Sequence, residues 1–325
     1  MKVLITGITG SGGSYLAEYL LTKDNVEVIG TSRWHSTATR SNVKNIQDKV
    51  EILSCDLCDF SRLYRILKKY KPDAIFHLAS LANVRDSFDN PLTVYNNNIN
   101  ITLNLLEGVR ILKEESGYNP KIQICSTSEV YGNVKSENIP ITEKCPLSPV
   151  NPYASSKLAQ DNLGYVYYKS FGLNVIRTRM FTYLNPRRSD LFATAFTRQV
   201  IDIEKGNLDV LKHGNLDSIR TIVDIRDAMS SYWYALTKGV QGKVYNIGGE
   251  HTLTVGEFLD MLKAEATCEI KSEQCPSLLR PVDVTLQIPD CSEFKKDTGW
   301  RPVYSLQDSI SFFIENVRKN YGQSN

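Results

Sequence analysis

Short apolar runs alternate with longer amphipathic segments along the first half of the chain. Runs rich in Val, Ile and Leu predict buried strands at residues 2–6, 26–32, 50–56, 73–79, 121–128 and 173–180. Apolar residues at helical spacing predict helices at residues 13–23, 61–70, 93–113 and 152–168. Strands separated by helices imply right-handed crossovers, so we expect an α/β fold with a doubly wound parallel sheet.

The rhythm of the pattern changes after about residue 180. Helices are expected at residues 191–205, 223–236, 254–265 and 306–321, and a strand at residues 243–249. This mixture predicts a smaller C-terminal substrate-binding lobe that interleaves with the sheet. We therefore expect a sheet domain at residues 1–175, to which a segment at about 219–249 returns, and a second lobe at 176–325.

Length and composition narrow the class of protein. The 325 residues suit about two domains. Lys and Arg total 38 against 36 for Asp and Glu, a balance that argues against a general nucleic-acid binder. No apolar run reaches the roughly 18 residues that span a membrane, and the N-terminus lacks a secretory signal. Seven scattered cysteines, with one isolated C-x-x-C at Cys55 and Cys58, predict a cytoplasmic protein with unpaired thiols and no bound metal.

A glycine-rich segment lies between the first strand and the first helix. It reads TGITGSGG, with glycines at 7, 10 and 13. Glycine permits a tight turn and a close approach of the backbone to a pyrophosphate, and a helix N-terminus offers unpaired N–H groups to an anion. We therefore expect a dinucleotide cofactor on this loop, held by Gly7, Thr9, Gly10, Gly12 and Gly13.

The end of the second strand bears on the choice of cofactor. An enzyme that uses NAD usually has an acidic residue there, whereas this chain has Arg33 and no acid. A guanidinium suits the 2′-phosphate of NADP, so the sequence favours NADP and leaves NAD as the alternative. Asp56 and Leu57 follow the third strand, where they are placed to bind the edge of the adenine.

Two pairs of residues carry candidate chemistry. Tyr153 and Lys157 are four residues apart on one helical face, so that a positive charge near the phenol would favour the phenolate and make Tyr153 a base. Thr127 and Glu129 are two residues apart at the end of a predicted strand, so their side chains are expected on the same side.

The motifs of this sequence, in their order along the chain, resemble those of the extended short-chain dehydrogenase/reductase family. The matching pieces are TGITGSGG, Asp56, the segment His77-Leu78-Ala79, Asn98, STSE at 126–129 and Y-x-x-x-K. The resemblance implies a Rossmann domain followed by a smaller lobe that binds a nucleotide sugar. It implies that Tyr153 is a base at a sugar hydroxyl, that Lys157 also binds the nicotinamide ribose, that Leu78 and Ala79 bind the cofactor and that Asn98 supports the substrate side of the site.

Within that family the chain is most similar to the 4,6-dehydratases of GDP-mannose and GDP-manno-heptose. The similar pieces are residues 6–21, STSEVYG, NPYASSKLAQD, PRRSD, HGNLDSIRT and LRPVDV. This resemblance implies that Arg220 and Arg280 bind the diphosphate. Arg187, with its neighbour Arg188, would contact the nucleotide or a neighbouring subunit. Thr182 stands where these enzymes usually have an Asn that contacts the substrate.

A 4,6-elimination must remove the proton from C5 and expel the C6 hydroxyl, which requires an acid/base beyond Tyr153. Thr127 and Glu129 supply a hydroxyl and a carboxylate for this step. The resemblance therefore implies a 4,6-dehydratase of a GDP-linked mannose or manno-heptose that recycles its hydride on NADP and forms a homodimer or homotetramer. The alternatives are an NADPH-dependent reductase, or an epimerase, of a GDP-4-keto-6-deoxy sugar, and a nucleotide-binding protein without catalysis.

Overall fold

The computed structural model describes residues 1–34, 40–279 and 284–321. Its central sheet has the strand order β10-β6-β5-β4-β1-β2-β3. The strands are β1 (Lys2–Thr6), β2 (Glu27–Ser32), β3 (Glu51–Ser54), β4 (Ala74–His77), β5 (Lys121–Thr127), β6 (Asn174–Met180) and β10 (Val244–Ile247). All seven are parallel, which confirms the predicted doubly wound fold and brings their carboxyl ends to one edge.

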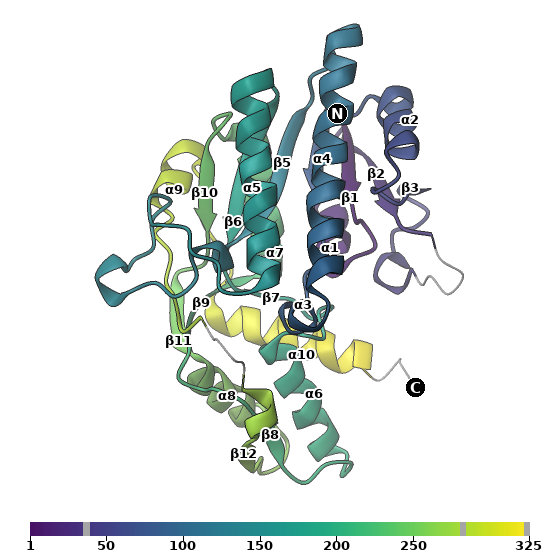
Figure 1. Cartoon of the computed structure of the whole chain (residues 1–325). Helices are drawn as coiled ribbons and strands as arrows, with labels where there is room; N and C mark the ends of the chain where they lie inside the picture. The colour runs from purple at the N-terminus through teal and green to yellow at the C-terminus, as the bar shows by residue number, and fades with distance from the viewer. Residues whose placement is uncertain (35–39, 280–283, 322–325) are drawn as a thin grey trace.

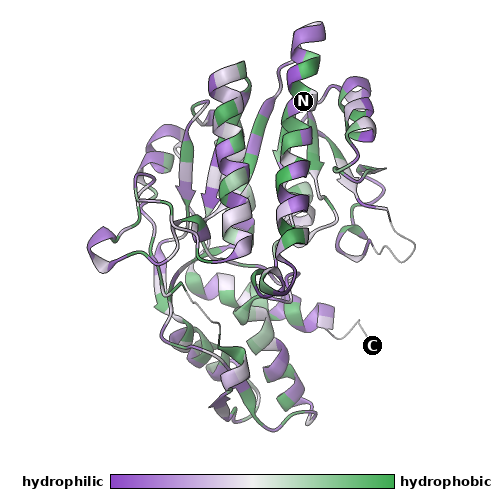
Figure 2. Ribbon diagram, in the orientation of Figure 1, coloured by the Kyte–Doolittle hydropathy of each residue, from purple (hydrophilic) through white to green (hydrophobic). Residues whose placement is uncertain are grey.

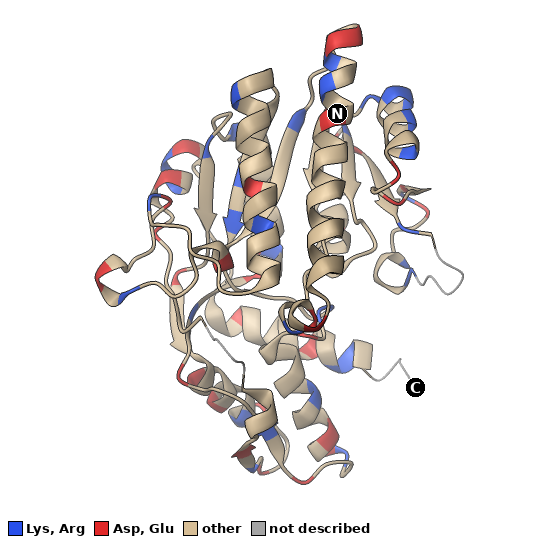
Figure 3. Ribbon diagram, viewed as in Figure 1, with Lys and Arg blue, Asp and Glu red and all other residues tan. Residues whose placement is uncertain are grey.

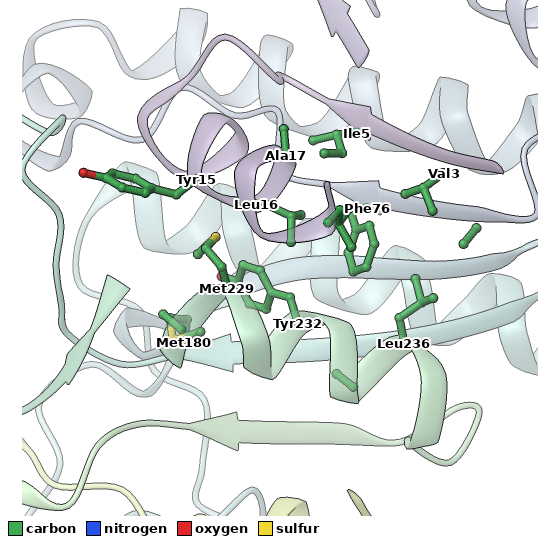
Figure 4. Packing of buried hydrophobic residues seen from close by; sticks show 14 of the residues in the cluster. Val3, Ile5, Tyr15, Leu16, Ala17, Phe76, Met180, Met229, Tyr232 and Leu236 are labelled. Atoms are coloured by element: carbon green, nitrogen blue, oxygen red, sulfur yellow. The ribbon is translucent and has the colours of Figure 1, made fainter. Parts of the chain in front are cut away.

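Helices cover both faces of this sheet (Figure 1). One face carries α2 (Phe60–Tyr70), α4 (Pro91–Ser116) and α5 (Pro152–Phe171), and the other carries α1 (Ser11–Leu20) and α7 (Ile225–Lys238). Successive side chains of a strand point to opposite faces, so Val3 and Ile5 pack with α1 and α7 whereas Leu4 packs with α2 and α4. Figure 4 shows the first of these cores, with Leu16, Met229 and Tyr232 against the sheet.

Local sequence signals fix where α5 begins and ends. The side chain of Asn151 accepts a hydrogen bond from the backbone N–H of Ala154, and Pro152 occupies the first turn. Gly172 ends the helix in a left-handed conformation. The cap therefore places Tyr153 and Lys157 in the first two turns, next to the carboxyl edge of the sheet.

The smaller lobe has a hydrophobic core of its own, which includes Phe196, Phe258 and Phe313. Its helices are α6 (Phe192–Glu204), α8 (Val255–Ala264) and α10 (Leu306–Tyr321). Its short strands are β7 (Tyr183–Leu184), β8 (Leu211–His213), β9 (Ile219–Asp224), β11 (His251–Thr254), β12 (Ser272–Gln274) and β13 (Leu286–Gln287). No helix in the described part of the chain is long and apolar enough to cross a membrane.

The sequence pattern missed several elements of this lobe and its borders. The helix expected from residue 223 begins at Ile225, because Val223 and Asp224 end strand β9 and the carboxylate of Asp224 caps the helix. The pattern also missed α3 (Val84–Asp89), α9 (Ser292–Thr298) and the short strands β7, β8, β11, β12 and β13. Helix α7 packs against α1 and β10 pairs with β6, so this later part of the chain joins the central sheet. Strand β6 continues to Met180, past residue 176, where the second lobe was expected to begin.

Candidate active site

A cleft opens at the carboxyl edge of the sheet where the strand order reverses between β1 and β4. Parallel α/β sheets bind ligands at such a point. The loops after β1, β2, β3 and β4 enclose a cavity of about 250 Å³ there. Its walls contain these sequence-predicted residues: Gly7, Thr9, Gly10, Arg33, Asp56, Leu57, Leu78 and Ala79.

The glycine loop fits a pyrophosphate at this cleft. Gly7 has a φ of +73°, and a Cβ on Gly13 would lie 2.3 Å from the carbonyl oxygen of Gly7. Both positions thus require glycine, because the first turn of α1 is stacked directly on the loop. Gly10 caps α1 without a side-chain hydrogen bond, so the N–H groups of that turn are available to an anion. Gly12 and Gly13 lie within this turn, and Gly12 approaches the Tyr183 hydroxyl.

The far end of the cleft contains the residues expected at the adenosine. Arg33 is exposed at the end of β2 and forms no ion pair with an acidic side chain of the described residues. The carboxylate of Asp56 accepts a hydrogen bond from the backbone N–H of Cys58 at 2.9 Å, which orients the loop after β3. Arg33 and Asp56 thus supply a donor and an acceptor at this end of the cleft, which suits the polar groups of an adenine dinucleotide.

A second cavity, of about 130 Å³, brings together the candidate catalytic side chains. Thr127 reaches it from the end of β5, and Tyr153 reaches it from α5. Glu129 reaches it from the short 3₁₀ helix η2 (Ser128–Tyr131), which begins where the predicted strand was expected to continue. Tyr183 and Arg188, from the segment after β6, form another wall. Lys157 lies one turn beyond Tyr153 and is buried beneath this cavity.

The surroundings of Tyr153 decide how readily its phenol ionises. Burial raises the pKa of Tyr153, and the guanidinium of Arg188 is the strongest influence in the opposite direction, followed by a hydrogen bond with Thr127. Burial also lowers the pKa of Lys157. Among the charges that act on Tyr153 in the described structure, Arg188 lowers its pKa most. The effect of Lys157 on the phenol, expected from the sequence, stays a prediction.

The carboxylate of Glu129 is held in a fixed orientation. The side-chain amide of Asn151 donates a hydrogen bond to Oε2 of Glu129 at 2.8 Å, and the other end of the same amide caps α5. The backbone N–H of Glu129 donates to the hydroxyl of Thr127 at 3.3 Å. A phenol, a hydroxyl and a carboxylate thus share one small cavity, an arrangement that can move protons at adjacent atoms of one substrate.

Asn98, which was expected to support the substrate side of the site, forms its hydrogen bonds within the protein. Its side chain is fully buried. The amide oxygen accepts a hydrogen bond from the N–H of Leu81 at 2.8 Å, and the amide nitrogen donates to the Ser156 hydroxyl at 2.9 Å. These bonds occupy the amide, so Asn98 ties α4 to α5 and to the loop after β4, and it supports the site from behind.

The predicted arginines have different environments. Arg187 was expected to contact the nucleotide or a neighbouring subunit. Its guanidinium forms an ion pair with Glu18 at 2.6 Å and stacks on Tyr15, so it lies against α1 and is not among the residues that line this cavity. Its neighbour Arg188 lines the cavity instead and pairs with Asp190.

Of the two arginines expected at the diphosphate, the structure describes Arg220. Arg220 lies in β9, and its guanidinium donates to the backbone carbonyls of Ile219 and Thr285. Arg280 lies outside the described residues.

Several residues of the cavity wall were not singled out from the sequence as site residues, among them Tyr183, Tyr232 and Gln287. Tyr232 belongs to the hydrophobic core, and its hydroxyl is 2.8 Å from the thiol of Cys125. Gln287 comes from a two-residue strand late in the chain. No periodicity marks so short an element, so only the folded chain reveals its place.

Comparisons with known proteins agree with this geometry. A family model described as GDP-mannose 4,6 dehydratase matches residues 4–312. The GDP-mannose 4,6-dehydratase of Yersinia enterocolitica is 32% identical, over 96% of this chain and 92% of that protein. The GDP-6-deoxy-D-mannose reductase of Pseudomonas aeruginosa is 30% identical, over 75% of this chain and 80% of that protein.

A solved structure extends the likeness to the whole fold. DesIV, the dTDP-glucose 4,6-dehydratase of Streptomyces venezuelae with NAD bound, superposes with a TM-score of 0.86 at 26% identity, over 99% of this chain and 98% of that chain. It shares the Rossmann sheet and the smaller lobe of the extended short-chain dehydrogenases/reductases. Because the family model covers both lobes and all four candidate catalytic residues, the chain belongs to the GDP-mannose 4,6-dehydratase family of enzymes.

Proposed function

We propose that the protein is a nucleotide-sugar 4,6-dehydratase that converts a GDP-linked mannose or manno-heptose to its 4-keto-6-deoxy derivative. The observation that carries the proposal is the oriented carboxylate of Glu129 in the same cavity as the phenol of Tyr153. A reductase of a 4-keto sugar has to move a proton only at O4, whereas an elimination also needs an acid/base for C5 and C6.

We propose NADP as the cofactor. The pyrophosphate fits the glycine loop, and the exposed guanidinium of Arg33 suits a 2′-phosphate. DesIV was solved with NAD, which is therefore the alternative cofactor. A bound nicotinamide would supply the acceptor and later the donor of the hydride that leaves C4 and returns to C6.

Each proton transfer of the proposed reaction is assigned to a side chain of the cavity. Tyr153 takes the proton from the C4 hydroxyl, and the charge of Arg188 counteracts the effect of burial on its pKa. Glu129 then takes the proton from C5 and delivers it to the C6 hydroxyl, which leaves as water. When the hydride returns to C6, the proton that Tyr153 took from O4 is delivered to C5, which restores both side chains. Thr127 orients the reacting hydroxyl by hydrogen bonding, and Asn151 keeps the carboxylate of Glu129 directed into the cavity.

The proposal extends to partners and location. The ligand is a GDP-sugar, and the chain forms a homodimer or homotetramer. Apolar side chains of α4 and α5 are exposed on one face, among them Leu103, Tyr165 and Val166, and these helices mix hydrophobic and hydrophilic positions (Figure 2). Acidic and basic residues are interspersed along the ribbons of both lobes (Figure 3), and the total of 38 Lys and Arg against 36 Asp and Glu suits a small-molecule ligand better than nucleic acid. All seven cysteines are unpaired, as suits a cytoplasmic protein.

Glu129→Gln separates the two enzyme functions. The substitution keeps the size of the side chain and its bond to Asn151 but removes the base. Oxidation at C4 should survive, while elimination slows by about 10²–10⁴-fold. The variant, incubated with GDP-mannose or GDP-manno-heptose, should accumulate bound NADPH that is visible by near-ultraviolet absorbance.

The wild-type protein provides the reference for this experiment. Loaded with NADP or with NAD and given each sugar, it should release a product lighter by one water in mass spectra, with no net consumption of cofactor. A wild-type protein that leaves intact GDP-hexoses unchanged and oxidises one NADPH for each 4-keto sugar would be a reductase, and Glu129 would then have a structural role.

A further inference from the structure

A buried amide lines the cavity of Tyr153 and Glu129 with one end unpaired. Gln287 in β13 is only 4% exposed. Its Oε1 accepts a hydrogen bond from the Ser128 hydroxyl at 3.1 Å, whereas its Nε2 has no partner among the described residues. The hydroxyl of Ser126, which lines the same cavity, also lacks a partner within that part of the chain.

Unpaired polar atoms of this kind call for an explanation. Buried polar groups are nearly always hydrogen-bonded, because burial removes the bonds they would make with water. The amide orientation of Gln287 is assigned from its contact with Ser128, and in the reverse orientation the unpaired end would be the carbonyl oxygen. In either orientation one end lacks a partner, and a sugar hydroxyl can donate to it or accept from it.

The position of Gln287 is fixed from two sides. In β13 it pairs in parallel register with Arg220 of β9, which holds its backbone. Its side chain is held by Ser128, which lies in the chain between Thr127 and Glu129. A polar group held in this way is preorganised for a ligand, because little side-chain freedom is lost on binding.

We infer that Gln287 recognises the sugar, by a hydrogen bond from its amide to a sugar hydroxyl at the end of the cavity next to Glu129. The inference rests on the proposed function for the identity of the ligand, a GDP-linked hexose or heptose. That hydroxyl belongs either to the part common to both sugars or to the additional carbon of the heptose. The chemistry of recognition is the same in the two cases, and it makes Gln287 a residue that determines sugar specificity.

The test measures binding without turnover. The protein is loaded with NADPH, so that an intact sugar cannot be oxidised, and the Kd values of GDP-mannose, GDP-manno-heptose and GDP are measured by calorimetry. Gln287→Met removes the amide and should weaken the binding of a GDP-sugar by roughly 3- to 10-fold while the Kd of GDP stays unchanged. A loss for both sugars assigns the shared hydroxyl, and a loss for the heptose alone assigns the hydroxyl of the additional carbon.

Two further variants keep the result interpretable. Gln287→Glu retains an oxygen for Ser128 but has no N–H to donate, so it tests the same bond if the Met variant does not fold. Gln123→Met is the matched control, since Gln123 is a buried glutamine of β5 that bonds to Thr178 and is absent from the cavity wall. It should leave all three Kd values unchanged.

The inference is overturned if the Gln287 variants bind both GDP-sugars as tightly as the wild type. It is equally overturned if the Kd of GDP rises by the same factor, because the residue would then act on the fold and not on the sugar. A wild-type protein that forms no dehydrated product, but whose Gln287 variants still bind GDP-sugars less tightly, would contradict the proposed function alone.

Discussion

A buried histidine joins β1, β4 and α4 beneath the cofactor cleft. Nδ1 of His77 lies 2.9 Å from the Thr6 hydroxyl, and Nε2 lies 2.9 Å from the Thr102 hydroxyl. Thr102 donates its own proton to the carbonyl of Asn98, so Nε2 of the imidazole must carry a proton. The Thr6 oxygen accepts from the N–H of Ala79, which leaves its hydroxyl proton for Nδ1. The network therefore requires a neutral imidazole.

This requirement makes the stability of the protein depend on pH. Burial, aided by the charge of Lys157, lowers the pKa of His77 to about 3. In the unfolded chain the pKa is about 6.5, so between these values the unfolded state binds more protons. The contribution of His77 to the free energy of unfolding is present above about pH 6.5 and is lost as the pH falls toward 3. Between pH 7 and pH 5 we expect a loss of about 2 kcal/mol.

Urea unfolding at the two pH values checks this expectation. His77→Gln has no group that titrates there, so its free energy of unfolding should fall by about 2 kcal/mol less than that of the wild type over the same interval. The difference between the wild type and the variant removes the contribution of the other titrating groups to the pH dependence. Equal pH dependence in the two proteins would mean that the histidine is not held neutral.

At the scale of elements, the turn from β1 into α1 depends on the absence of a side chain at Gly13. A Cβ there would lie 2.3 Å from the oxygen and 3.0 Å from the carbon of the Gly7 carbonyl. These are backbone atoms, which cannot rotate away as a flexible side chain can. The loop would have to move, and with it the N–H groups offered to the pyrophosphate.

Gly13→Ala should therefore lower the free energy of unfolding by about 1–3 kcal/mol and weaken cofactor binding. Gly256→Ala is the matched control, because a Cβ at that position in α8 meets neighbours only at 3.5 Å or more. Thermal unfolding and titration with NADP measure the two effects. Unchanged NADP affinity in Gly13→Ala would contradict the assignment of this loop to the pyrophosphate.

At the scale of the whole molecule, α4 and α5 expose a face with apolar side chains that a second subunit would cover. Helices α4 and α5 lie side by side on one face of the sheet (Figure 1). Leu103 of α4 and Tyr165 and Val166 of α5 are more than one third exposed. A second copy of the chain would bury such a face, since isologous interfaces pair the same surface of both subunits.

Val166→Glu should shift the protein from dimer or tetramer toward monomer. A carboxylate at a position 46% exposed is tolerated by the fold but would be buried, without a partner, in an interface. Val303→Glu is the control, because Val303 is 82% exposed in a loop away from these helices. Sedimentation velocity gives the mass of each protein, and a Val166→Glu protein that remains as associated as the wild type would place the interface elsewhere.

Local signals in the sequence determined the central sheet and part of the site. Strand composition and helical periodicity predicted six strands of the parallel sheet and their principal helices, because both patterns arise within a few residues of one element. They also predicted the strand at 243–249, in the segment expected to return to the sheet domain. The glycine loop could also be predicted from the sequence, since the close approach of the Gly7 carbonyl to Gly13 excludes any side chain there. Thr127, Glu129 and Tyr153 share a cavity, as the order of strands and helices suggested.

The tertiary structure alone decided the remaining contacts. Adjacent arginines diverge, Arg187 onto α1 and Arg188 into the cavity, because the fold presents a different partner to each. Asn98 is occupied by hydrogen bonds within the protein. Gln287 bonds to Ser128, which is 159 residues away in the sequence. It lies in a two-residue strand, which is too short to show the alternation of apolar and polar residues that predicts a strand. These positions depend on which distant segments pack together, and that information is absent from any local stretch of the sequence.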